Sequence, residues 1–146
     1  MTTIVPQNIR ALDVPNPQTF AQPAVLMVEV PITTNLAAND IVQIGVLHAA
    51  CRVVSATVEG VNIPAATLLT VGTLDGERWN SNDANRAMVE EIISGAPGNA
   101  PRDATMTSIF ALTKSPDHRG LGVKVSAAIT AAAAAAVRFR ITYIAE

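Results

Sequence analysis

The stretch from Asp40 to Asp75 decides the fold, because it holds three short apolar runs in succession. They read DIVQIGVLH (40–48), CRVVSATVEGVNIP (51–64) and TLLTVGTLD (67–75). Valine, isoleucine, leucine and threonine dominate each run, and small or turn-forming residues separate them. This pattern is typical of consecutive antiparallel strands. No catalytic constellation lies in the stretch or near it.

Alternation of apolar and polar residues extends the β pattern to the rest of the chain. Strands are expected at 24–32, 40–47, 52–58, 68–74, 105–113, 122–130 and 137–144. The alternation predicts that two sets of side chains each share a face: Val42, Ile44 and Val46, and Val54, Ala56 and Val58. A turn is expected at Glu59-Gly60, and strand ends with a hairpin connection at Ala131–Ala136.

One helix is expected, over 83–94, where Ala84, Met88 and Ile92 recur at helical spacing. Ser81 or Asn82 would cap it and Gly95 would end it. Arg86 and Glu90 would form an i,i+4 pair on its surface.

Together these elements predict an all-β fold, an antiparallel β-sandwich of jelly-roll-like type with one short helix. Seven or eight strands, one short helix and no βαβ rhythm favour antiparallel sheets. We expect a single β-sandwich domain over 24–146, preceded by an extended, proline-rich arm over 1–23.

The arm contains four prolines, which oppose both helix and central-strand structure. It is too apolar for a solvated tail. It therefore either folds back on its own domain or reaches onto a neighbouring subunit. The residues expected to form a partner contact are Ile4, Val5, Ile9, Leu12 and Val14.

Composition excludes several classes of function. Charged residues make up 15% of the 146 residues and the net charge is −2, so the basic face of a nucleic-acid binder is not expected. No run is long enough to span a membrane, and no signal peptide is expected. A surface rich in alanine and threonine and poor in charge indicates either coverage by partners or a plain β domain of small residues.

No arrangement of side chains supports catalysis, metal binding or a cofactor. His48 and His118 are the only histidines and have no metal-ligand spacing. Asp117 beside His118 lacks the nucleophile elbow that a triad needs. Glu90 and Glu91 are adjacent, so they point apart. We expect a protein that is not an enzyme and that binds no cofactor.

Two other features have a structural interpretation. Cys51 precedes Arg52, which would lower the pKa of the thiol if the two groups were close, but a buried cysteine at a strand start is the simpler interpretation. Arg138 and Arg140 lie opposite Phe139 and are expected to be solvated or paired with an acidic partner surface.

The runs at 40–47, 51–58, 68–75 and 137–144 resemble small head proteins of tailed bacteriophages. They are similar in particular to jelly-roll cement (decoration) proteins, and the similarity covers roughly residues 24–144. The resemblance implies a virion protein on the capsid exterior, assembled in the host cytoplasm. Its implied role is to bind the major capsid protein and clamp neighbouring subunits, with a dimer or trimer as the expected state.

Two alternatives stay open. A phage tail or connector protein would show the same pattern of short apolar runs. A small glycan- or ligand-binding β module would use exposed aromatic platforms, for which only Trp79 and Tyr143 are obvious candidates.

Overall fold

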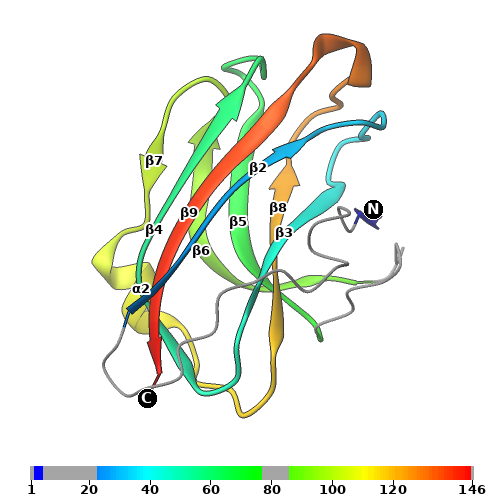
Figure 1. Ribbon diagram of the computed structural model, residues 1–146. Coiled ribbons are helices and arrows are strands. Elements are labelled where there is room, and N and C mark those ends of the chain that lie inside the picture. The colour runs from blue at the N-terminus through cyan, green and yellow to red at the C-terminus, as the bar shows by residue number, and fades with distance from the viewer. Residues whose placement is uncertain (1, 5–22, 77–85, 146) are drawn as a thin grey trace.

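The structure is a computed structural model that describes residues 2–4, 23–76 and 86–145. Two sheets pack face to face, as Figure 1 shows. The five-stranded sheet has the order β1-β3-β8-β5-β6 and the four-stranded sheet has the order β2-β9-β4-β7. The predicted jelly-roll-like β-sandwich is confirmed.

The strands of the five-stranded sheet are β1 (Thr3–Ile4), β3 (Ile41–Leu47), β5 (Leu68–Leu74), β6 (Met88–Pro97) and β8 (Arg119–Val125). Those of the four-stranded sheet are β2 (Pro23–Pro31), β4 (Cys51–Val61), β7 (Arg102–Asp103) and β9 (Ala136–Ala145). Every pairing is antiparallel except that of β1 with β3, which is parallel.

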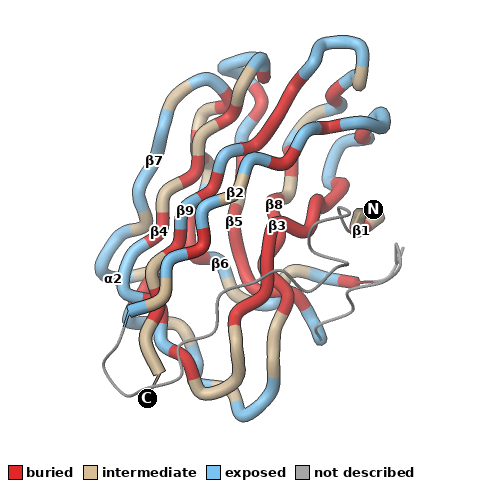
Figure 2. Tube along the Cα trace, viewed as in Figure 1, coloured by how far each residue is buried: buried red, intermediate tan, exposed pale blue. Residues whose placement is uncertain are grey.

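The core lies between the sheets, where the buried faces of β3, β4, β5, β8 and β9 meet (Figure 2). β9 is central in the four-stranded sheet and buries Val137, Phe139, Ile141 and Tyr143, the residues that its alternation places together. The strands expected at 40–47, 68–74 and 137–144 are therefore confirmed, with ends that differ by a residue or less.

Two β-bulges change which side chains share a face. In β3 the register shifts between Gln43 and Gly45, so Leu47 joins Val42 and Ile44 in the core cluster in place of Val46. In β4 the register shifts between Val53 and Ser55, which leaves Val54 47% exposed. The prediction for Val46 and Val54 was wrong because one extra residue reverses the alternation beyond it.

The expected helix over 83–94 is also wrong where the structure describes it. Residues 88–94 belong to strand β6, which pairs with β5. Met88 and Ile92 are four residues apart, a spacing that suits one helix face and one strand face equally. Pairing with β5 decides the outcome, and Glu90 contacts Arg119 rather than Arg86.

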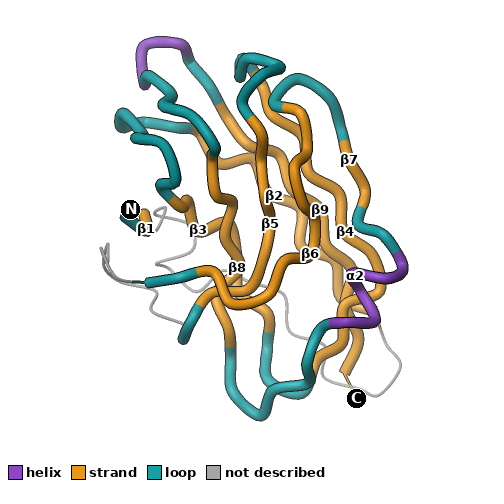
Figure 3. The backbone as a smooth tube through the Cα atoms, turned by 180° about the vertical axis from the view of Figure 1, so that it is seen from behind, coloured by secondary structure: helices purple, strands orange, loops and turns teal. Residues whose placement is uncertain are grey.

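The helix instead occupies part of the strand expected at 105–113. α2 (Met106–Ala111) begins after Thr105, whose hydroxyl oxygen accepts a hydrogen bond from the Ser108 N–H at 3.1 Å. Ile109 is buried against the sandwich, and Figure 3 shows α2 beside the start of β4. The capping threonine is the signal that marks this helix.

Two predicted turns also differ. Glu59 and Gly60 lie inside β4, which continues to Val61. The run Ala131–Ala136 forms the 3₁₀ turn η1 (Ala131–Ala133), a left-handed Ala134 and the start of β9. It connects β8 of one sheet to β9 of the other, so it is not a hairpin. β8 begins at Arg119 and ends at Val125, earlier than the expected strand at 122–130.

Candidate partner-binding surface

The start of the chain is attached to the five-stranded sheet. The backbone N–H of Thr2 donates to Asp40 Oδ1 at 2.9 Å, and the Ile41 N–H donates to the Thr2 carbonyl at 2.9 Å. The buried Thr3 hydroxyl donates to the carbonyl of Arg86 at 3.0 Å. Residues 2–4 therefore belong to the sandwich as an added parallel strand.

The predicted arm residues are split by this arrangement. Ile4 is half-buried and packs against the core of its own domain. Val5, Ile9, Leu12 and Val14 lie outside the described residues. The role of these four as a partner contact stays a prediction, whereas Ile4 has a structural role within the domain.

The outer face of the four-stranded sheet carries exposed apolar side chains. Val25 is 46% exposed and Met27 is 74% exposed on β2, and Val54 is exposed on β4, with β9 between the two strands. Met106 and Phe110 of α2 are also exposed, and the Arg52 guanidinium at the start of β4 lies 4.8 Å from the centre of the Phe110 ring. Exposed apolar groups gathered on one face are typical of surfaces that partners cover.

Charged side chains on this face form two rows that run across the strands. In the first row, Arg138 of β9 bonds Glu29 of β2 at 2.6 Å and lies 3.8 Å from Glu59 of β4. The hydrogen bond that Arg138 donates to Glu29, and then the negative charge of Glu29, raise the pKa of Arg138. The Arg138 side chain is 54% exposed, as a solvated residue would be, and its acidic partners in the structure come from its own domain.

In the second row, Arg140 donates to the Thr57 hydroxyl at 3.1 Å, and that hydroxyl donates to Asp103 at 2.6 Å. Residues of both rows line a shallow groove on this face, together with Met27 and Pro101. The groove is lined by Met27 and by charged and hydroxyl side chains, which suits a protein surface rather than a sugar.

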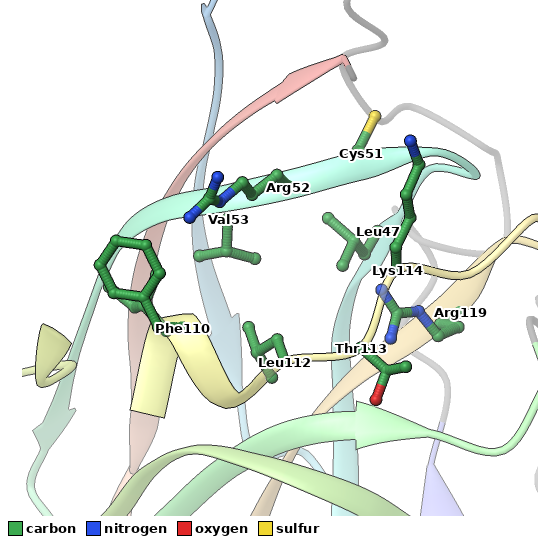
Figure 4. Close-up of a pocket in the computed structure, with 10 residues that line it drawn as sticks. Leu47, Cys51, Arg52, Val53, Phe110, Leu112, Thr113, Lys114 and Arg119 are labelled. Atoms are coloured by element: carbon green, nitrogen blue, oxygen red, sulfur yellow. The ribbon is translucent and has the colours of Figure 1, made fainter. Parts of the chain in front are cut away.

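The pocket between β4, α2 and β8 is drawn in Figure 4 and contains the cysteine. It measures about 140 Å³ and is lined in part by Cys51, Arg52 and Arg119. Burial raises the pKa of the Cys51 thiol, so the neighbouring Arg52 does not activate it. The interpretation of Cys51 as a buried structural residue agrees with this position.

The two histidines lie together at one end of the sandwich. Their ring centres are 5.0 Å apart, and the Ala49 N–H donates to His118 Nδ1 at 2.9 Å. Asp117 is exposed, with its N–H bonded to the Ser115 hydroxyl. Within the described ranges, no three His, Cys, Asp or Glu side chains are placed to hold a metal ion.

The aromatic platforms of a glycan-binding module are not found where the structure can test them. Tyr143 is fully buried in the core, and Trp79 lies outside the described residues. Among the helices that the structure describes, none is long and apolar enough to cross a bilayer.

The burial of Tyr143 leads to a measurable prediction, because it is the sole tyrosine of the chain. Desolvation, assisted by the nearby Cys51, raises its pKa to about 12. We expect ultraviolet titration of the folded protein to show phenolate formation near pH 12, and of the unfolded protein near pH 10. Tyr143 prefers the protonated form in the folded state, so its contribution to stability is complete below pH 10 and is lost between pH 10 and 12. A native titration near pH 10 without unfolding would contradict the burial.

Comparison with solved structures finds chains of phage capsids. A chain in the capsid of Ralstonia phage GP4 is similar to this chain over 99% of its length and 98% of the other, with 27% identity and a TM-score of 0.79. A chain in the capsid asymmetric unit of cyanophage Pam1 shares the fold, at 18% identity and a TM-score of 0.54 over 91% of each chain. No protein-family model and no curated protein matches significantly.

Proposed function

We propose that this chain is a structural virion protein that binds the outer surface of a phage capsid and stabilises contacts between major capsid protein subunits. The observation that supports it most is the similarity to a chain of the phage GP4 capsid over nearly the whole of both chains. The capsid neighbours also favour a structural role over an enzymatic one. A rigid β domain suits this task, because it loses little conformational entropy when it docks.

The proposed role on the capsid exterior is distinguished from other virion roles by copy number. We expect quantitative mass spectrometry of gradient-purified particles to find hundreds of copies, near parity with the major capsid protein. A few to a few tens of copies would indicate the alternative role in a tail or connector. Absence from the particles would contradict a virion role altogether.

The second part of the proposal concerns the arm, whose residues Val5, Ile9, Leu12 and Val14 are taken as contacts with a shell subunit. Deleting residues 1–15 is a poor test, because it also removes β1 and the hydrogen bonds of Thr2 and Thr3. Replacing the four apolar residues by serine leaves residues 2–4 in place and separates shell binding from folding.

We expect the four-serine variant to keep the far-ultraviolet circular dichroism and melting temperature of the natural chain and to lose most of its binding to particles that lack this protein. Co-sedimentation with such particles measures the loss. The matched control is Ile4→Ser, which should lower the melting temperature, because Ile4 packs against the core. Unchanged co-sedimentation of the four-serine variant would refute the arm contact.

A further inference from the structure

β2 forms one edge of the four-stranded sheet, as Figure 1 shows. All nine of its residues are in register with β9, from Pro23 opposite Ile144 to Pro31 opposite Ala136. Its other edge pairs with no strand among the described residues. A long open edge presents unpaired backbone groups that accept another strand.

One hydrogen bond shows which residues of β2 point their backbone N–H and C=O groups toward the open edge of the sheet. The Ile32 N–H donates to the Ala135 carbonyl at 2.8 Å, so the backbone of residue 32 points toward β9. Because backbone direction alternates along an antiparallel strand, residues 24, 26, 28 and 30 also point toward β9. The backbone N–H and C=O groups of Val25, Met27 and Glu29 therefore point away from β9, toward the open edge.

The outward positions end at a proline on each side. Pro23 and Pro31 also point away from β9, and neither has an N–H group to donate. Each stands four residues from Met27, so the pattern of donors along the open edge is the same when read in either direction. An antiparallel partner strand with this same pattern would match it fully.

We infer that two copies of this chain pair through the open edges of β2, antiparallel and about a two-fold axis at Met27. Met27 then lies opposite Met27 of the second copy, and the Val25 of each copy lies opposite the Glu29 of the other. The resulting three residue pairs each exchange two backbone hydrogen bonds. The prolines end the ladder, and the two four-stranded sheets become one continuous sheet.

The side chains are compatible with this register. Pairing covers Met27 and Val25, which are 74% and 46% exposed in the single chain. Each Glu29 faces a valine rather than the other Glu29, so no like charges are opposed. Each Glu29 also keeps its 2.6 Å bond to Arg138 within its own copy. A strand from a different protein would satisfy the hydrogen bonds but not the two-fold symmetry.

That symmetry allows a decisive test, because residue 27 meets its own copy. Full-length natural protein is examined by sedimentation velocity over concentrations up to about 1 mM, which detects even weak association. We expect a reversible dimer for the natural chain. Met27→Lys and Met27→Glu alone should each be monomeric, because like charges meet on the axis. An equimolar mixture of the two variants should form a heterodimer.

The matched control is Val54→Lys, which places a charge on an exposed apolar position of the same sheet face, away from the β2 edge. This variant should remain dimeric, and circular dichroism should show all variants folded. A monomeric natural chain, a dimer that survives Met27→Lys, or a mixture that stays monomeric would overturn the inference, and the last result would favour a different partner strand. Dimerisation is measured on purified protein, so it stands or fails independently of the virion role.

Discussion

Replacing Arg86 by methionine is expected to lower the free energy of unfolding by about 3–5 kcal/mol, because it removes the donor of several hydrogen bonds to buried or partly buried acceptors. Arg86 is 3% exposed. Its guanidinium donates to Gln43 Oε1, to the Asp75 carbonyl from Nε at 2.8 Å, and to the Gly76 carbonyl. Methionine fills the volume but leaves these acceptors without that donor.

The position of Arg86 explains why the effect should be large. It joins the outer face of β3 to the turn after β5, and its own carbonyl accepts the hydroxyl of Thr3 in β1. A Cβ atom at Gly120 would lie 2.2 Å from Nη2 of Arg86, so the glycine provides the space for the guanidinium. Arg86 thus links three segments that are separate in the sequence, namely β1, β3 and the turn after β5.

Urea unfolding at fixed protein concentration measures the change. Arg86→Lys should recover only part of the loss, because a single ammonium cannot reproduce the planar fork. The control is Arg102→Met on the exposed strand β7, where we expect a change within about 0.5 kcal/mol. Equal effects for Arg86→Met and Arg102→Met would show that the buried hydrogen bonds contribute nothing specific.

Gly60→Ala is the second change expected to be strongly destabilising, by about 3 kcal/mol, through overpacking. A Cβ atom at Gly60 would lie 2.1 Å from the backbone oxygen of Gly98. Backbone atoms cannot rotate away as a side chain can, so the loop after β6 has to move as a unit. Gly98 is itself confined, since its own Cβ would meet the Pro64 carbonyl oxygen at 2.5 Å.

Gly45→Ala is the matched comparison. Its Cβ would also clash, at 2.5 Å, but with the end of the Leu26 side chain, which can change its rotamer. We expect a cost of about 1 kcal/mol for Gly45→Ala, and thermal unfolding of both variants gives the order directly. If Gly45→Ala were the more damaging variant, the close approach between β4 and the loop at Gly98 would not be rigid.

The strands that the sequence predicts best are those whose residues carry an unambiguous period. β9 alternates without interruption, and β5 consists of a short apolar run between turns, so both were predicted within a residue or so. Local pattern was insufficient where one spacing suits two structures. Met88 and Ile92 recur at a distance that fits helix and strand alike, and only the pairing with β5 decides between them.

Bulges and long-range contacts are the other source of error. The bulge at Val54 is a property of the β4–β9 register, and no residue type near it announces the change. Arg86 was interpreted as a surface residue of a helix, because its partners Gln43 and Gly76 are brought to it only by the folded sheet. The exposed edge of β2 likewise depends on strand order, although its flanking prolines are visible in the sequence.

The two-residue length of β7 has a consequence for how far association can proceed. At that edge of the four-stranded sheet, Arg102–Asp103 and α2 cover β4, with Ala104 N–H bonded to the Ala56 carbonyl at 2.8 Å. Only β2 offers a long edge in this sheet, so in a dimer formed there the joined sheet has no second long edge for a third copy. Addition at β2 is therefore self-terminating within this sheet, because continuous growth of the four-stranded sheets stops at two copies.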